Sequence, residues 1–319
     1  MQDNKPLQKR KKIVVIGGGT GVFTVLSGLR KYPVDLTAVV SMADDGGSTG
    51  VLREEFGILP PGDIRRALVA LSHSDRILCD LFNYRFQEGG LRGHTFGNIM
   101  LTAFERMTGS FEEAVARAAQ VLNVKGTVLP VTLDHVRLCA KLEDGTVVRG
   151  ETNIDIPKHD GRLKIVQAWL EPAGLLNKKA RAALLAADLI VIGPGDLYTS
   201  IVPNLLVKGM RSALKRSRAP KMYVVNVMTK WGETHGFSAM DFVNVVERYA
   251  GRRILDHIMV NTAKPSRQQM RFYEKEQSQF IEASSLPPKS VSTLGDFLRG
   301  RGFVRHDPDR LARAIMALV

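Results

Sequence analysis

The sequence has little of what disulfide-stabilised or membrane-spanning proteins contain. Its only cysteines are Cys79 and Cys139, and neither belongs to a Cys-x-x-Cys pair or a Cys/His cluster. Two isolated thiols exclude a disulfide framework and a thiolate zinc site, and they are typical of a reducing compartment, so we expect a cytoplasmic protein. No apolar run approaches the length of a membrane span, and the run at 13–16 is too short for a signal peptide.

Aromatic residues are also scarce, at 7% of 319 residues, although 44% of the chain is hydrophobic and can form a large core. The formal net charge of +13 raises the question of nucleic-acid binding. However, the basic residues are not interleaved with aromatic ones and match no known reading motif. Because cationic surfaces also attract small anions, we expect a phosphorylated metabolite as partner rather than nucleic acid.

A glycine-rich segment at 17–21 follows a short β-branched run and precedes apolar residues at helical spacing. The order strand, glycine loop, helix predicts an anion site, because the first amides of a helix lack intrahelical partners. Its candidate ligand contacts are Gly18, Gly19, Thr20 and Gly21. The spacing does not meet Gly-x-Gly-x-x-Gly, which disfavours an NAD-dependent oxidoreductase, and a turn without a ligand stays an alternative.

A second motif, at 44–50, lies just beyond a predicted strand at 36–41, where ligands of parallel sheets collect. Asp45 is the candidate for a Mg²⁺ ion or for ribose hydroxyls. The neighbouring ligand candidates are Gly46, Gly47 and Ser48. A solvated Asp/Gly turn is the alternative. The segment also matches the nucleophile elbow Gly-x-Ser-x-Gly, but two aspartates separate it from the strand and nothing marks a partner histidine, which disfavours a hydrolase.

Further polar segments begin helices or end strands. Asp63 either complements a helix dipole or accompanies a phosphate clamp made by Arg65 or Arg66. His94 and Asn98 lie four residues apart and can share a helix face. The remaining ligand candidates follow two later strands and are Gly193, Gly195, Asp196 and Asn226. Two glycine turns at one sheet edge can hold the two ends of one nucleotide.

The hydrophobic pattern predicts an α/β fold with a mainly parallel sheet and a small β excursion at about 128–170. We expect a basic flexible tail at 1–10 and one domain over 11–319, whose segment 266–319 completes the ligand site. The predicted strands lie at 13–16, 36–41, 128–132, 136–142, 146–150, 166–170, 189–192, 222–227 and 257–260. The predicted helices lie at 64–71, 97–107, 111–122, 178–187, 204–215 and 240–249.

Six motifs, in this order and spacing, carry a resemblance that runs from about residue 12 to about residue 307. They are GGGTG, ADDGGSTG, PPGDIRR, HTFGN, IGPGDLYTS and NVMTKWGET. The chain resembles the gluconeogenesis-factor family, a branch of the superfamily named for 2-phospho-L-lactate transferase. The resemblance implies a cytoplasmic bacterial protein with a Rossmann-like three-layer fold that binds a nucleotide sugar such as UDP-N-acetylglucosamine.

The same resemblance implies a metabolite-responsive regulator of cell shape and wall synthesis during gluconeogenic growth, rather than a proven enzyme. By motif position, Tyr273 and Arg305 contact the nucleotide sugar. The related transferases work with Mg²⁺ and aspartates, which gives Asp45 the place of the metal-binding or acceptor-facing acid and makes a Mg²⁺-dependent transferase the alternative function. A cell-wall synthesis protein and a homodimer are the partners left open.

Overall fold

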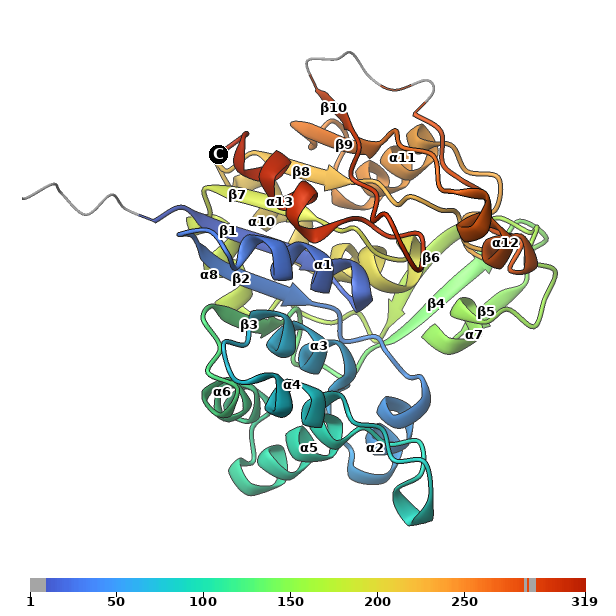
Figure 1. Ribbon diagram of the computed structural model, residues 1–319. Coiled ribbons are helices and arrows are strands. Elements are labelled where there is room, and N and C mark those ends of the chain that lie inside the picture. Colours follow the sequence, from blue (N-terminus) through green and yellow to red (C-terminus); the bar gives the residue numbers. More distant parts are fainter. Residues whose placement is uncertain (1–9, 284–285, 287–290) are drawn as a thin grey trace, which may run out of the picture.

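The computed structural model describes residues 10–283, 286 and 291–319. The basic tail expected at 1–10 therefore lies outside the described residues, apart from Arg10. Within them, seven strands form one parallel sheet in the order β10-β9-β8-β7-β1-β2-β3 (Figure 1). The strands are β1 (Lys12–Gly17), β2 (Asp35–Val40), β3 (Thr127–Pro130), β7 (Leu189–Ile192), β8 (Lys221–Val224), β9 (His257–Asn261) and β10 (Ser292–Gly295).

The central strands are apolar because helices cover both faces of the sheet. Every residue of β1 after Lys12 is buried, and so is every residue of β7. Val15 lies opposite Ala38 on one side and Val191 on the other. Continuous β-branched runs of this kind are typical of parallel strands, and the predicted parallel sheet is confirmed.

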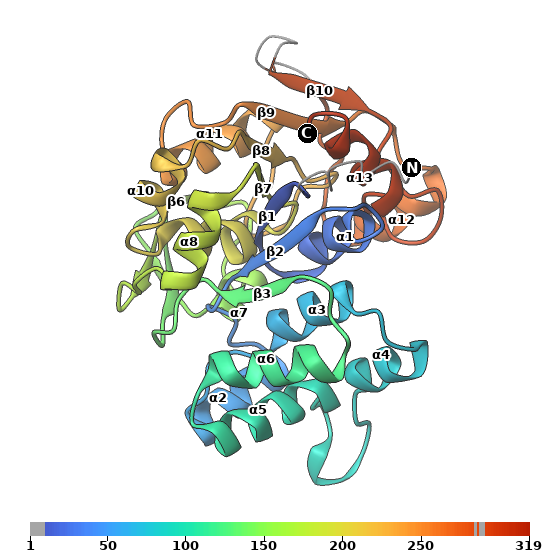
Figure 2. The same ribbon diagram turned by 90° about the vertical axis from the view of Figure 1, so that its left-hand side faces the viewer.

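Figure 2 shows helices on the two faces of the sheet, so the expected three layers are present. One face carries α1 (Gly19–Leu29), α3 (Gly62–Leu71) and α13 (Pro308–Met316). The other carries α8 (Lys178–Ala186), α10 (Met210–Arg216) and α11 (Ala239–Ala250). None of the helices in the described part of the chain is long and apolar enough to cross a bilayer.

A group of helices follows β2 and precedes β3 in the sequence. It extends beyond the edge of the sheet that β3 forms (Figure 1). It contains α2 (Gly47–Phe56), α3, α4 (Arg76–Asn83), the short 3₁₀ helix η1 (Gly89–Leu91), α5 (Phe96–Thr108) and α6 (Phe111–Val121). The sequence predicted α3, α5 and α6 but not α2, because α2 begins inside the glycine-rich motif.

The β excursion is a three-stranded antiparallel sheet in the order β5-β4-β6. It contains β4 (Arg137–Leu142), β5 (Val147–Arg149) and β6 (Ile165–Glu171), with α7 (Glu151–Asp155) inserted after β5. The excursion begins later than the expected residue 128, because β3 pairs in parallel with β2 in the main sheet. Its hairpin across 143–145 is present as predicted.

The helix predicted at 204–215 is wrong as a single element. The chain forms a π-helical turn η2 (Leu197–Ile201), a short helix α9 (Val202–Leu206) and then α10. Gly209 separates the two helices with φ of +103°, a left-handed conformation that ends helical continuity. The apolar residues keep a helical spacing across Gly209, so the hydrophobic periodicity did not reveal the break between the two helices. A further helix, α12 (Arg267–Lys275), follows β9 along the chain.

Candidate functional site

A cavity of about 710 Å³ lies where several strands of the main sheet end. Its lining follows the C-terminal ends of β1, β2, β7 and β8. Strands β1 and β7 are neighbours, yet the chain leaves them toward opposite edges of the sheet. This is the topological switch point at which open α/β sheets bind ligands, and the cavity has the size of a small-molecule site.

The structure brings the predicted site residues together, with two exceptions. Those that line the cavity are Gly18, Gly19, Thr20, Gly21, Gly46, Gly47, Ser48, Asn98, Gly195, Asp196, Asn226, Tyr273 and Arg305. Asp45 and Gly193 do not line it. The segments 17–21, 44–50 and 193–196 thus share one rim, as expected. That each of these residues contacts a ligand stays a prediction.

Two glycine segments, residues 18–21 and 194–195, form one side of the cavity, which we call the glycine wall. A Cβ atom added to Gly21 would lie 2.1 Å from the Pro194 carbonyl oxygen, so the two segments are in backbone contact. Gly195 in turn donates its N–H to Asn226 Oδ1 at 3.3 Å. Glycine is needed at position 21, because any larger side chain would meet the backbone of the second segment.

A carboxylate of the chain itself already lies against the glycine wall. A Cβ on Gly18 would lie 2.4 Å from Asp63 Oδ2, and the Gly19 N–H donates to the same carboxylate. Arg66 lies 3.2 Å from Asp63 Oδ1. Burial, together with the charge of Asp44, raises the pKa of Asp63 to about 6. Asp63 therefore complements the first turn of α1 as well as that of its own helix, α3.

Of the two adjacent aspartates at 44–45, Asp44 is the one that lines the cavity. Burial raises the pKa of Asp44 above its usual value. Asp45 instead accepts hydrogen bonds from the backbone N–H groups of Glu151, at 3.1 Å, and Thr152, at 2.8 Å. It thereby joins the second motif to the first turn of α7. The metal-binding role predicted for Asp45 stays a prediction.

Ser48 belongs to a buried polar network. Its Oγ lies 3.1 Å from His94 Nδ1, and Asn98 Nδ2 donates to the same oxygen at 3.2 Å. Arg65 Nε donates to Asn98 Oδ1 at 3.0 Å. The structure thus supplies a histidine partner that the sequence did not reveal, but Ser48 lies inside helix α2 and not in a sharp strand-to-helix turn. Arg65 is buried and holds this network, whereas Arg66 is more exposed and faces the cavity.

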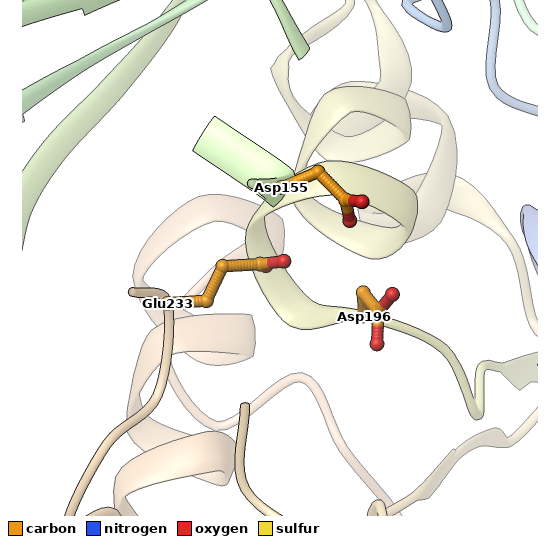
Figure 3. A group of neighbouring side chains, drawn as sticks. All are labelled: Asp155, Asp196 and Glu233. Atoms are coloured by element: carbon orange, nitrogen blue, oxygen red, sulfur yellow. The ribbon is translucent and has the colours of Figure 1, made fainter. Parts of the chain in front are cut away.

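Three carboxylates form a cluster on the side of the cavity near α7. One oxygen atom from each of Asp155, Asp196 and Glu233 lies within 4.8 Å of the others (Figure 3). Oxygen donors suit Mg²⁺ or Ca²⁺, so the donor set alone fits a divalent cation. Lys230 Nζ lies among them, 2.9 Å from Asp196 Oδ2 and 3.2 Å from Glu233 Oε1, and also forms an ion pair with Asp155. We call these three acids the acidic cluster.

Glu151 adds a further acid to this side of the cavity. Burial and the nearby charges of Asp44 and Asp155 raise the pKa of Glu151 to about 9, so the carboxyl group is neutral at pH 7. Burial likewise raises the pKa of Glu233 to about 7. The cavity therefore has the glycine wall with Asp63 and Arg66 on one side and the hydrogen-bond-accepting carboxylates of the acidic cluster on the other.

Comparison of the sequence with known proteins identifies the family to which this fold belongs. The family model of 2-phospho-L-lactate transferase CofD matches residues 13–293. The chain belongs to the CofD family. A protein of Halalkalibacterium halodurans named gluconeogenesis factor is 41% identical, with 97% of this chain and 96% of the relative covered. A Listeria innocua protein of the same name is 40% identical, covering 98% of this chain and 97% of the relative.

The fold is shared with a solved member of the group. A crystal structure of a Bacillus halodurans protein superposes with a TM-score of 0.91 at 40% identity, covering 97% of this chain and all of the other. Among the branches of the CofD family, the chain is therefore a gluconeogenesis-factor homologue, as the motifs indicated.

The CofD family model ends before the last segment that lines the cavity. Phe303 and Arg305 lie beyond residue 293, and Phe272 approaches them from α12. The Phe272 and Phe303 rings meet edge to face with centroids 5.1 Å apart, and the Arg305 guanidinium lies 5.3 Å from the Phe303 centroid. Tyr273 donates its hydroxyl to the Val304 carbonyl at 3.3 Å, which holds the two segments together.

Sequence reasoning missed several residues in and behind the cavity of this CofD family member. It does not single out Lys230, Asp155, Phe272, Phe303 and His306, which line the cavity, or Glu233, which is buried beside Lys230. His306 is buried with its Nε2 unpartnered, and burial lowers its pKa to about 4. The spacing of Lys230 and Glu233 at i and i+3 was the one local signal available. The remaining residues come together only through the fold.

Proposed function

We propose that the chain binds a nucleotide sugar, with UDP-N-acetylglucosamine as the first candidate, and acts as a metabolite-responsive regulator of cell shape and wall synthesis. The observation that carries this proposal is the two-sided cavity at the β1/β7 switch point. The Arg66 guanidinium beside the glycine wall suits a diphosphate, because it donates hydrogen bonds to phosphate oxygens. Carboxylates on the other side accept hydrogen bonds from sugar hydroxyls.

The aromatic residues at the cavity mouth supply a place for the base. Phe272 and Phe303 are 47% and 52% exposed, so each offers ring surface for stacking. Arg305 beside Phe303 is suited to the diphosphate. In this proposal residues 11–319 act as one domain in which segment 266–319 completes the ligand site. A cell-wall synthesis protein and a second copy of the chain are the candidate partners.

A thermal-shift series tests ligand binding. We expect UDP-N-acetylglucosamine to raise the melting temperature, because a ligand that binds only the folded state stabilises it by mass action. Arg305→Ala should remove most of the shift, whereas Arg299→Ala, an exposed arginine outside the cavity lining, should leave it unchanged. If both arginine variants kept the full shift, the assigned site would be wrong.

A Mg²⁺-dependent transferase is the second candidate function. It is favoured by the half-buried Asp44 and the buried Asp63, two cavity carboxylates close enough for the charge of Asp44 to raise the pKa of Asp63 beside the glycine wall. A divalent cation between such acids and a ligand phosphate would relieve their repulsion. The test is incubation with Mg²⁺, a guanylated phospholactate donor and a deazaflavin acceptor. We expect a product that Asp45→Asn or Asp63→Asn abolishes, and absence of product in the unaltered protein would reject this function.

A further inference from the structure

The acidic cluster is assembled from three segments that are far apart in the sequence. Asp155 ends α7, Asp196 precedes η2, and Glu233 follows β8 in the loop at 226–234. The side chain of Glu233 is completely buried, whereas those of Asp155 and Asp196 are 32% and 43% exposed. Three carboxylates this close repel one another unless a cation lies among them.

A lysine of the chain provides that cation. An ammonium group has three N–H donors, and the Lys230 ammonium has ion-pair partners in all three carboxylates of the acidic cluster. Although burial favours a neutral amine, the charges of Glu233, Asp196 and Asp155 raise the pKa of Lys230 above its usual value. Lys230 therefore stays charged over the whole range in which proteins are normally studied.

The carboxylate of Glu233 is fully engaged by neighbouring groups. Its Oε2 accepts the Tyr198 N–H at 2.9 Å, and its Oε1 accepts the Thr199 hydroxyl at 3.1 Å in addition to the Lys230 contact. A metal ion at this point would have to replace the ammonium and take an oxygen that is already shared. Glu233 is therefore oriented for the lysine that the structure contains.

The backbone holds Lys230 in this position. Its N–H donates to Thr234 Oγ1 at 2.9 Å, and its carbonyl accepts the Thr234 N–H at 2.8 Å. Thr234 is buried, so the loop that carries Lys230 and Glu233 is fixed on the inside of the molecule. The lysine side chain starts from an anchored turn and is 28% exposed where it reaches the cavity.

We propose that Lys230 occupies the cation position of the acidic cluster, so that the cavity contains its own monovalent cation there and takes no divalent metal at that point. The cluster then presents oxygen acceptors with a fixed ammonium among them. A ligand group placed against it meets both hydrogen-bond acceptors and a donor, which suits a hydroxyl-bearing or N-acylated sugar. This last step rests on the proposed function, whereas the lysine's role as cation does not.

Titration of the full chain with Mn²⁺ alone, followed by electron paramagnetic resonance of the free ion, tests the proposal. We expect Asp196→Asn to leave Mn²⁺ binding of the unaltered protein unchanged, because the cluster contributes no metal site. Lys230→Met should create a site at least tenfold tighter than any in the unaltered protein, and adding Asp196→Asn should remove it. Lys230→Arg, which keeps the charge, should not create it.

Two results would overturn the proposal. One is Mn²⁺ binding by the unaltered protein that Asp196→Asn weakens, a comparison that holds even if Lys230→Met does not fold. The other is a folded Lys230→Met protein, with Lys230→Gln as its second version, that gains no Mn²⁺ site. Because no nucleotide is present, these results do not depend on the proposed ligand. Failure of the proposed function would appear separately, as the absence of any nucleotide-induced thermal shift.

Discussion

The glycine wall and the acidic cluster face the same cavity but are held in place by opposite means. Backbone packing without side chains builds the glycine wall, where a Cβ on Gly21 would lie 2.1 Å from a carbonyl oxygen. Charged side chains around the single ammonium of Lys230 build the acidic cluster. The first region is therefore sensitive to added volume at Gly21, whereas the second is sensitive to an unbalanced change of charge.

Removing the lysine is expected to have the largest effect on stability. Lys230→Met leaves the buried Glu233 carboxylate without its cation, and loss of one partner of a buried pair costs about 3 to 5 kcal/mol. Urea unfolding at pH 8, above the pKa of about 7 that Glu233 has beside Lys230, measures the loss. The double variant Lys230→Met with Glu233→Gln should recover more than half of it. Equal losses of stability in the single and the double variant would mean that charge balance does not stabilise the acidic cluster.

Added volume in the glycine wall should have the next largest effect. Gly21→Ala forces the two loops apart, and we expect a loss of about 3 kcal/mol, because overpacking against backbone cannot be relieved by a side-chain rotation. Gly90→Ala is the matched control, since a Cβ there meets nothing within 4 Å. Urea unfolding of both proteins measures the difference. Similar stabilities would contradict the close loop contact.

The Asp63 carboxylate at the glycine wall makes the free energy of unfolding depend on pH. The pKa of Asp63 rises from 3.8 to about 6 on folding, so between these values the folded state holds a proton that the unfolded state releases. Stability therefore falls as pH rises through this window, by about 3 kcal/mol for two pKa units. Asp63→Asn should remove this fall, so unfolding free energies at pH 4 and pH 7.5 should differ less in the variant. An unchanged difference would place the pKa of Asp63 near its ordinary value.

A smaller effect, on ligand affinity, is expected at the cavity mouth. This part of the cavity lies outside both the glycine wall and the acidic cluster. Phe303→Ala should weaken UDP-N-acetylglucosamine binding about tenfold, or about 1.4 kcal/mol, through loss of a stacking surface. Phe56→Ala, which removes a phenylalanine of similar exposure outside the cavity lining, is the control. Isothermal titration calorimetry gives both affinities. A weaker affinity in the control alone would remove Phe303 from the site.

The glycine wall could be predicted from sequence because each of its segments is contiguous and directly follows a strand. Parallel strands bring their C-terminal ends to one edge, so the sequence places Gly18 and Gly195 at the same edge, and the pairing of β1 with β7 brings them together. The sequence did not reveal that two aspartates of the chain itself form hydrogen bonds with backbone amides near this site. Asp63 accepts the Gly19 N–H and lies against Gly18, and Asp45 accepts hydrogen bonds from the first turn of α7.

The acidic cluster could not be predicted in the same way. Asp155 ends a five-residue helix in the small sheet, and nothing in its own neighbourhood marks it. Asp196 lies in the loop after β7 and Lys230 in the loop after β8, so only tertiary packing brings their charges together. The same reason applies to Phe303, whose partner Phe272 lies in another segment.

Hydrogen exchange of backbone amides, measured with and without UDP-N-acetylglucosamine, tests the central claim that the cavity at the strand ends is a nucleotide-sugar site. The account predicts slower exchange in segments 17–21, 193–196 and 303–306, with little change in α6, none of whose residues line the cavity. Protection confined to other segments, or none at a ligand concentration that saturates binding, would contradict it.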